Sequence, residues 1–583
     1  MKSLQEIQKI LDKFVTIPID LPRLYFLGDT GAGKTTLIRK ILGTDNFAFP
    51  SIRQTRTTVA TTEFVIVNQS TFKGVFIFKQ EEEVKGSIQE IISDSIVKCY
   101  TRYTFDVKKI AKRYLKQTSD QRFRLYYLLD NDEMQSIAHK ITSLKPKLDE
   151  YIGTIKGEFP DENDETLILE LALGEPEIKT ELNSIVEWIF NRINFKIGSM
   201  FEGVELKDKY FNFETRDREQ FIKKCKIILA SERNTISPVI EYARIQGKLI
   251  ANWLEDTELV LVDGEGIGHD TREVGQIDPR HYDQFYLADH IVLIEESRRP
   301  FVGGGKHALK NIYSRGYGDK LAIFFSKLDE VIPDDSKGSI KDKVDLVLES
   351  YENVCAALRE DNISIHDNID KVFFLHALNE DELDSFTKEQ INNFLSFIKE
   401  SKSPPSFVEP IFDYEMLSAY LFESAKEFIK NFFALLDEAH WQTVKAFNRR
   451  MTWGKDGFKH LLPIVFFEAY FNKSLDQFIS EHIRWKQPIS STQAEEYLNL
   501  LKREINHNVI SYSRNIIIYD NKSKWEEAFE LSGRGSTKIR LQKIQDILLN
   551  AVPNKPESLS ELKEAFKKII QDSIEHYMKE TEL

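Results

Sequence analysis

The sequence has 583 residues, of which 41% are hydrophobic and 30% are charged, and its formal net charge at pH 7 is −14. A chain of this length predicts about two to four domains with cores of their own. The acidic balance argues against a large nucleic-acid-binding face, because such faces are basic. Cys99, Cys225 and Cys355 are widely separated and lack the spacing of metal ligands. They indicate buried thiols in a reducing compartment.

The apolar segments of the sequence are short. The first residues lack the apolar core of a secretion signal. The best candidate for a membrane span, Leu461–Phe471, contains a glutamate and is too short to cross a bilayer. We therefore expect a soluble, cytoplasmic protein.

The predicted elements begin with a short amphipathic helix over 3–15 and an apolar strand that ends at Gly28. Residues 28–35, Gly-Asp-Thr-Gly-Ala-Gly-Lys-Thr, follow this strand, and a helix is predicted from Leu37 onward. A strand, a loop of the form G-x-x-x-x-G-K-T and a helix are together the setting of a phosphate-binding P-loop.

The residue types of this loop suit a bound polyphosphate. Glycines allow main-chain amides to turn toward an anion, and the following helix adds its positive dipole end. Lys34 supplies charge to the outer phosphates, and the Thr35 hydroxyl can bind Mg²⁺. The sequence therefore predicts a nucleoside triphosphate site that contains Gly28, Asp29, Gly31, Ala32, Gly33, Lys34, Thr35 and Thr36.

The next elements complete the first part of the predicted nucleotide-binding domain, residues 1–80. A polar, threonine-rich loop over 49–59 leads to two strands with alternating apolar residues, 60–67 and 74–78. Because a short turn joins these strands, we expect them to form an antiparallel hairpin.

Residues 81–254 differ in character, because helical periodicity with charged faces replaces the strand pattern. The helical stretches are 88–115, 122–148, 178–195 and 221–230. This block is too long for a connection, so the sequence predicts a helical insertion.

Strands alternate with helices again over 255–400. The predicted strands are 258–263, 290–294, 321–325 and 371–375, and the predicted helices include 306–313, 340–358 and 384–399. This alternation specifies a doubly wound, mostly parallel sheet. A linker at 401–406 then opens a mostly helical C-terminal domain, 401–583. The predicted fold class is an α/β P-loop NTPase domain with a helical insertion and an α-helical C-terminal domain.

Two further motifs follow predicted strands directly. Asp263 ends a buried strand and Gly266 lies three residues later, an arrangement in which the carboxylate can hold Mg²⁺ through water and the Gly266 amide can meet the γ-phosphate. Ser326-Lys327-Leu328-Asp329 approximates the Asn/Thr-Lys-x-Asp element that recognises guanine. The Asp329 carboxylate can accept hydrogen bonds from ring and exocyclic guanine nitrogens, which adenine cannot offer. The Lys327 stem can cover the base.

In order, strand context and spacing, these motifs resemble the translation-factor-related (TRAFAC) class of P-loop GTPases. The threonine-rich loop and the aliphatic Ile267 are most similar to the dynamin-like and septin-like branches. The resemblance covers roughly 20–80 and 255–400, which would form the G domain, while the helical insertion departs from both branches.

This resemblance implies GTP and Mg²⁺ as ligands and a metal set of Thr35, Asp263 and one threonine of the first switch loop. Thr57 or Thr58 would close over Mg²⁺ and the γ-phosphate. In His376-Ala377-Leu378-Asn379, the Ala377 amide would face the guanine carbonyl.

Ile267 replaces the glutamine with which small GTPases orient the attacking water. Candidates for that role are Thr30, Arg53, Arg56, His269, Asp270, Arg272 or a partner protein. The expected catalytic set is Lys34, Thr30, Thr57, Thr58, His269 and Arg56. We expect slow intrinsic hydrolysis that rises on self-association or partner binding.

Two other segments carry possible functions. Gly303-Gly304-Gly305-Lys306 lacks the spacing of a second phosphate loop and predicts a helix start. Residues 448–459 mix cations with aromatic side chains, which would suit contact with acidic lipid or nucleic acid, but a solvated loop is favoured.

The leading hypothesis is a GTP-binding and GTP-hydrolysing switch in which Mg²⁺ and GTP change the conformation or self-association of the helical domains. A nucleotide-gated interaction protein with little turnover is the second hypothesis. A dynamin-like membrane-acting GTPase is the third.

Overall fold

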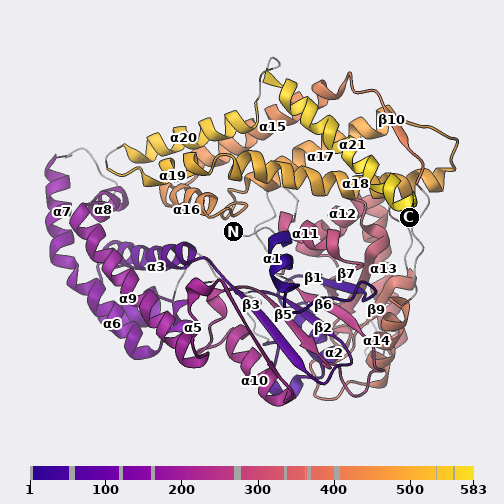
Figure 1. Ribbon diagram of the computed structural model, residues 1–583, viewed down its shortest axis with the longest axis horizontal. Helices are drawn as coiled ribbons and strands as arrows, with labels where there is room; N and C mark the ends of the chain where they lie inside the picture. Colours follow the sequence, from indigo (N-terminus) through magenta and orange to yellow (C-terminus); the bar gives the residue numbers. More distant parts are fainter. Residues whose placement is uncertain are drawn as a thin grey trace. The chain divides into compact units, whose positions relative to one another are not determined.

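The structure is a computed structural model that describes residues 4–582 apart from 52–59, 117–122, 159–164, 265, 268–276, 334–337, 362, 364, 366–368, 400–406, 534, 554 and 556–557. The chain forms two compact units, and Figure 1 labels their helices and strands. The first consists of Met1–Leu21, Thr35–Glu265 and Ser532–Ser536, and the second consists of Pro22–Lys34, Gly266–Leu531 and Thr537–Leu583.

The strands of the first unit lie in the order β4-β3-β5-β2-β6. Their bounds are Thr61–Ile66 for β2, Phe72–Phe78 for β3, Tyr210–Thr215 for β4, Ile240–Gly247 for β5 and Leu259–Asp263 for β6. β5 is parallel to β2 and antiparallel to β3, and the pairs β2–β6 and β3–β4 are antiparallel. The predicted hairpin of β2 and β3 is therefore wrong, because β5 lies between these two strands.

A buried ion pair joins β5 to β2. Arg244 and Glu63 are register partners with fully buried side chains, and Nε of Arg244 lies 2.5 Å from Oε2 of Glu63. Gln8 and Tyr242 donate hydrogen bonds to Oε1 of Glu63, at 2.7 and 2.6 Å. A buried charge is costly without its partner, so this pair favours β5 as the neighbour of β2.

The predicted insertion is helical only in its first part. Helices α3 to α9 span Glu81–Thr101, Val107–Lys109, Leu125–Leu128, Asn131–Ser143, Lys145–Glu158, Glu165–Leu173 and Pro176–Met200. α9 buries apolar residues at three- and four-residue spacing and packs against α3. The remainder, β4, α10 (Arg218–Leu229) and β5, belongs to the sheet and its flank. The first unit also includes α1 (Leu4–Leu11) and most of α2 (Lys34–Leu42).

The strands of the second unit confirm the parallel α/β pattern. β1 (Arg23–Gly28), β7 (His290–Glu296), β8 (Leu321–Ser326) and β9 (Val372–Phe374) lie in this order, and each neighbouring pair is parallel. Four helices separate or follow these strands: α11 (Pro279–Leu287), α12 (Gly304–Ser314), α13 (Ile340–Glu360) and α14 (Ser385–Phe397). Buried apolar strands of this kind require helices on both faces of the sheet.

The rest of the second unit is mostly helical, as predicted. Helices α15 to α21 span Leu417–Glu438, Trp441–Thr452, Pro463–His482, Ser491–Arg514, Lys522–Glu530, Ser536–Ala551 and Ser560–Glu582. Two short antiparallel strands, β10 (Pro410–Phe412) and β11 (Ile483–Trp485), accompany them. Phenylalanines build the core of these helices, including the fully buried Phe428, Phe432, Phe467, Phe471 and Phe566.

The segment 448–459 is neither a solvated loop throughout nor an open cationic surface. Its first residues belong to α16, and Arg449 and Arg450 are only 8% and 5% exposed. Arg449 lies over the Phe529 ring at 4.9 Å, and Arg450 lies over the Phe458 ring at 4.1 Å. The aromatic neighbours therefore hold these guanidinium groups inside the protein.

Within the residues that the structure describes, no helix combines the length and the apolar character that crossing a membrane requires.

Candidate nucleotide site

The strand ends of the second unit bring the predicted motifs to one sheet edge. Gly28 of β1 is the register partner of Ile294 in β7, and Glu296 of β7 is the partner of Ser326 in β8. Phe325 of β8 is in turn the partner of Phe374 in β9. Because these strands are parallel, the segments that follow them lie at the same edge, where α/β proteins bind ligands.

The P-loop begins where two backbones approach closely. A Cβ on Gly28 would lie 2.6 Å from the Ile294 carbonyl oxygen, which leaves no room for a side chain. Gly33 has a φ of +98°, a conformation that other residues rarely adopt. These glycines explain why the loop can turn its amides inward. Lys34, at the start of α2, is 7% exposed.

Gly266 lies against the P-loop. The Ile267 N–H donates to the Gly28 carbonyl at 3.1 Å, and a Cβ on Gly266 would lie 3.6 Å from the Thr30 hydroxyl oxygen. Gly266 therefore lies beside the P-loop in the second unit, and its predicted contact with the γ-phosphate stays a prediction. In the first unit, Thr35 and Thr36 are 7% exposed, and Asp263, the last residue of β6, is 3% exposed.

Several predicted residues lie outside the described part of the chain. They are Arg53, Arg56, Thr57, Thr58, His269, Asp270 and Arg272. Their proposed roles in metal binding and water activation stay predictions.

The predicted base-recognising residues contact each other. Oδ1 of Asp329 accepts the Ala377 N–H at 2.8 Å. Lys327 and Ala377 have φ of 57° and 47°. Such unusual values persist where the surrounding contacts hold a loop in a defined conformation. The Ser326 hydroxyl lies 2.6 Å from the carbonyl oxygen of Ala32 in the P-loop. Ser326 therefore ties the predicted base site to the predicted phosphate site.

Lys327 is also held by an ion pair with Glu296. Its side chain is 25% exposed. A long aliphatic stem fixed at its charged end suits the predicted role of covering a planar base.

Glu295 is a buried acid at this edge that the sequence did not single out. Its Oε2 accepts the Phe301 N–H at 3.1 Å, and the residue is 5% exposed. Burial raises the pKa of Glu295 to about 8; the Phe301 bond lowers this pKa, and Asp29 and Glu296 raise it. No sequence pattern separates Glu295 from the neighbouring Glu296.

The three glycines at 303–305 start a helix, as predicted. α12 begins at Gly304, whose N–H donates to Oδ2 of the P-loop residue Asp29 at 3.2 Å. A Cβ on Gly305 would lie 1.7 Å from Oε1 of Glu295, so this helix starts in direct contact with the buried acid. Asp29 thus contacts α12, a role that phosphate-loop spacing does not predict.

The residues present fit a guanine nucleotide and its magnesium ion. Gly31 and Gly33, with φ of 91° and 98°, give the P-loop the backbone concavity that suits phosphate oxygens. At the other end of the site, the Asp329 carboxylate accepts the Ala377 N–H with Oδ1, and its second oxygen, Oδ2, would be the acceptor for a base. Lys34 and Thr35 would contact the phosphates and the metal, which neutralises phosphate charge when it is bound.

No family model matches the sequence, and no curated protein matches it. Two solved structures resemble the chain, and both are described as an oligomerised bacterial dynamin pair that provides a mechanism for the long-range sensing and tethering of membranes. They are 14% and 13% identical to this chain, with TM-scores of 0.30 and 0.28. Each match covers 98% of this chain and 75% of the other. TM-scores this low assign neither fold nor function.

Proposed function

We propose that this protein binds Mg²⁺ and GTP at the edge formed by β1, β7, β8 and β9, hydrolyses the nucleotide slowly, and uses the bound state to change its conformation or self-association. One observation carries the proposal. The glycine-rich loop, Gly266 and the Asp329–Ala377 pair lie at one edge of a parallel sheet in a single unit. A polyphosphate and a purine base need this combination of amides, cation and carboxylate.

A measurement of the GTP affinity of the Lys34→Ala variant tests the proposal. The expected loss is at least about tenfold in GTP affinity, because a charge-assisted contact to phosphate is removed. The matched control is Lys306→Ala, which removes an exposed lysine beside the other glycine-rich segment. Equal GTP affinity of both variants and the native protein, in competition with a fluorescent GTP analogue, would contradict the P-loop assignment.

Turnover separates a hydrolysing switch from a nucleotide-gated interaction protein. Because Ile267 cannot orient water, we expect the rate per molecule to rise with protein concentration. Sizing the protein with GTP and with a non-hydrolysable GTP analogue would show whether association accompanies binding. Tight binding and association without turnover would favour the second hypothesis.

Membrane binding is not part of the proposal. Two of the cations in the segment 448–459 that suggested lipid contact, Arg449 and Arg450, are buried. Liposome flotation with anionic vesicles should leave the protein unbound.

A further inference from the structure

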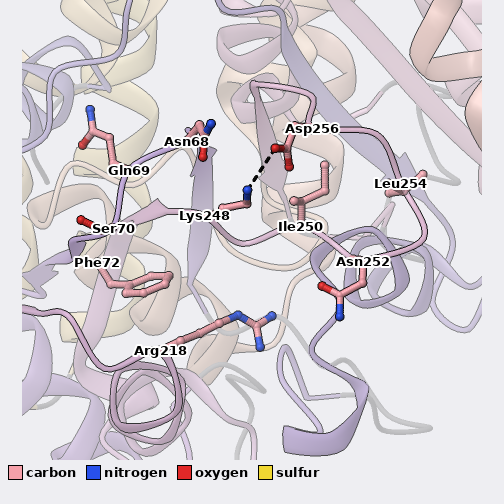
Figure 2. A pocket seen from close by; sticks show the side chains of 11 residues that line it. Asn68, Gln69, Ser70, Phe72, Arg218, Lys248, Ile250, Asn252, Leu254 and Asp256 are labelled. Carbon is pink, nitrogen blue, oxygen red and sulfur yellow. Dashed lines mark hydrogen bonds and ion pairs between the residues drawn. The ribbon is translucent and has the colours of Figure 1, made fainter.

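A cavity lies within the first unit, and none of its lining residues belongs to the candidate nucleotide site. It has a volume of about 670 Å³ and is formed by the turn between β2 and β3, the start of α10 and the segment after β5 (Figure 2). Binding pockets for small molecules have volumes of roughly 300–1,000 Å³. The cavity is therefore large enough for a ligand.

The cavity has an apolar part and a polar part. Phe72, Ile250, Ala251 and Leu254 are buried residues that line it with apolar atoms. The polar lining consists of Asn68, Gln69, Ser70, Arg218, Lys248, Asn252 and Asp256. A surface of this kind matches a ligand with one apolar and one polar end.

The charges of the lining favour an anion. Lys248 is paired with Asp256 at 3.0 Å, as the dashed line in Figure 2 marks, so these two charges offset each other. Arg218 donates instead to the main-chain carbonyls of Leu42 and Gly43, at 3.3 and 3.0 Å. Among the residues that the structure describes, no carboxylate forms an ion pair with Arg218. The lining therefore has one more cation than anion, and Glu258 lies at its edge, where it accepts the Asn68 N–H at 2.5 Å.

Arg218 is suited to hold such an anion. Both of these hydrogen bonds use Nη2, so the other N–H groups of the guanidinium can face the cavity. Burial lowers the pKa of the guanidinium, and Glu219 raises it. A partly desolvated cation with neutral partners gains more from an anion than a solvated one.

We propose that this cavity binds a small organic anion, whose carboxylate or phosphate contacts Arg218 and whose apolar part contacts Phe72, Ile250 and Leu254. The site lies beside the last turn of α2, because Ala251 N–H donates to the Ile41 carbonyl at 2.8 Å. A ligand here would contact Arg218 and Ala251, which are hydrogen-bonded to the opposite end of the helix that begins at Lys34.

Three probes test both halves of the site by ligand-observed NMR titration at constant ionic strength. Phenyl phosphate carries both groups, inorganic phosphate carries only the anion, and benzyl alcohol carries only the ring. We expect phenyl phosphate to bind at least about tenfold more tightly than either single-group probe. Failure of phenyl phosphate to bind, or equal binding of all three probes, would overturn the proposal.

Variants locate the binding. Arg218→Gln keeps an amide donor for the α2 carbonyls but removes the charge, and should weaken phenyl phosphate binding at least about tenfold. Lys223→Gln, on an exposed position of the same helix, should change it by less than about twofold. Lys34→Ala should leave it unchanged, and loss in that variant would assign the binding to the P-loop instead. This result would overturn the cavity proposal without affecting the nucleotide proposal.

A second pair of variants avoids the contacts of Arg218 with α2. Ser70→Asp places a negative charge on the exposed rim and should weaken binding, while Ser70→Asn should not. Unchanged binding in Arg218→Gln, or in Ser70→Asp, would contradict the proposed anion site.

Discussion

In the proposed function, base selection depends on the carboxylate of Asp329. It accepts the Ala377 N–H at 2.8 Å, so the predicted acceptor and donor for guanine are adjacent. Asp329→Asn places an amide N–H where guanine needs a hydrogen-bond acceptor for its exocyclic amino group. Xanthine carries an oxygen at that position, and this oxygen can accept a hydrogen bond from the amide. We expect GTP affinity to fall at least about tenfold and xanthosine triphosphate to become the better ligand. Competition binding measures both.

Glu330→Gln is the matched control for this change. Glu330 is the next residue and contacts Arg298 at 3.5 Å on the protein surface. Its substitution should not alter the order of nucleotide affinities. An unchanged preference for GTP in Asp329→Asn would contradict the guanine assignment.

Glu295 makes stability depend on pH with a defined sign. Its pKa is raised from 4.5 to about 8 in the folded protein, so across this window the folded state holds a proton that the unfolded state has released. The contribution of Glu295 to the free energy of unfolding therefore falls as pH rises from 4.5 to 8, by up to about 1.4 kcal/mol per pH unit. Above pH 8 this contribution no longer changes.

Glu295→Gln tests this sign, because glutamine mimics the neutral acid. Relative to the native protein, the variant should gain stability steadily across the same pH window in urea unfolding. Glu330→Gln, a surface acid, should leave the slope unchanged. Parallel pH profiles of the native protein and Glu295→Gln would show that Glu295 titrates normally.

Replacement of glycine by alanine should have opposite effects on the free energy of unfolding at Gly28 and at Gly153. Gly28→Ala forces a methyl group to within 2.6 Å of the Ile294 carbonyl and should lower the free energy of unfolding by about 1–3 kcal/mol. Gly153 lies in α7 with nothing within 4 Å of a built Cβ, so Gly153→Ala should raise it by about 1 kcal/mol. Equal effects in denaturant unfolding would contradict the close approach at Gly28.

At the scale of elements, the second unit followed the sequence, whereas the first departed from it at β4 and β5. Continuous apolar runs predicted β1, β7, β8 and β9, because each strand is buried on both faces and needs no particular partner to be recognised. β5 was missed because Arg244 and Gln246 interrupt its apolar pattern. These polar groups are buried only because tertiary partners, such as Glu63 for Arg244, are present.

The candidate site also contains residues whose positions the sequence predicted and residues that it did not single out. Motif spacing predicted where Gly266, Ser326 and Asp329 lie, since each directly follows a strand or its turn. It could not predict Glu295, whose unusual environment comes from Gly305, a neighbour in space that is ten residues away in sequence. It also missed the burial of Arg449 and Arg450, which depends on aromatic rings from other segments.

The ion pair between β2 and β5 can be tested as an element-level contact. Glu63→Gln leaves the buried Arg244 with Asp12, at 2.6 Å, as its carboxylate partner and should cost about 3 kcal/mol of unfolding free energy. Glu219→Gln, which breaks the exposed pair with Lys223, should cost less than about 1 kcal/mol. Similar urea midpoints for the two variants would mean that the buried pair does not hold β5 in place.

At the scale of the molecule, α12 connects the candidate nucleotide edge to the C-terminal helices within the second unit. Its first residue bonds to Asp29 of the P-loop. Directly after its last turn, Arg315 lies 2.6 Å from Glu468 and 3.1 Å from Asp476, both in α17. A helix fixed at both ends transmits displacement rather than absorbing it.

Glu468→Gln should weaken this connection. It leaves Arg315 with a single carboxylate and should lower unfolding free energy by about 3 kcal/mol. The nucleotide-dependent change in hydrogen exchange of α17 should also decrease. Lys426→Gln, in an exposed pair with Glu423, is the control and should leave exchange in α17 unchanged. If the hydrogen exchange of α17 in Glu468→Gln responded to nucleotide as it does in the native protein, the Arg315–Glu468 pair would not be the connection between the nucleotide edge and α17.

The central position of β5 also has a consequence during synthesis of the chain. β2 and β3 leave the ribosome before the whole helical insertion, and the strand that belongs between them follows on the order of ten seconds later. The insertion, built from local helical contacts, can fold in that interval. The nascent strands meanwhile expose edges that invite pairing with each other or with neighbouring chains. We therefore expect the nascent chain to be most prone to wrong strand pairing before β5 has been translated.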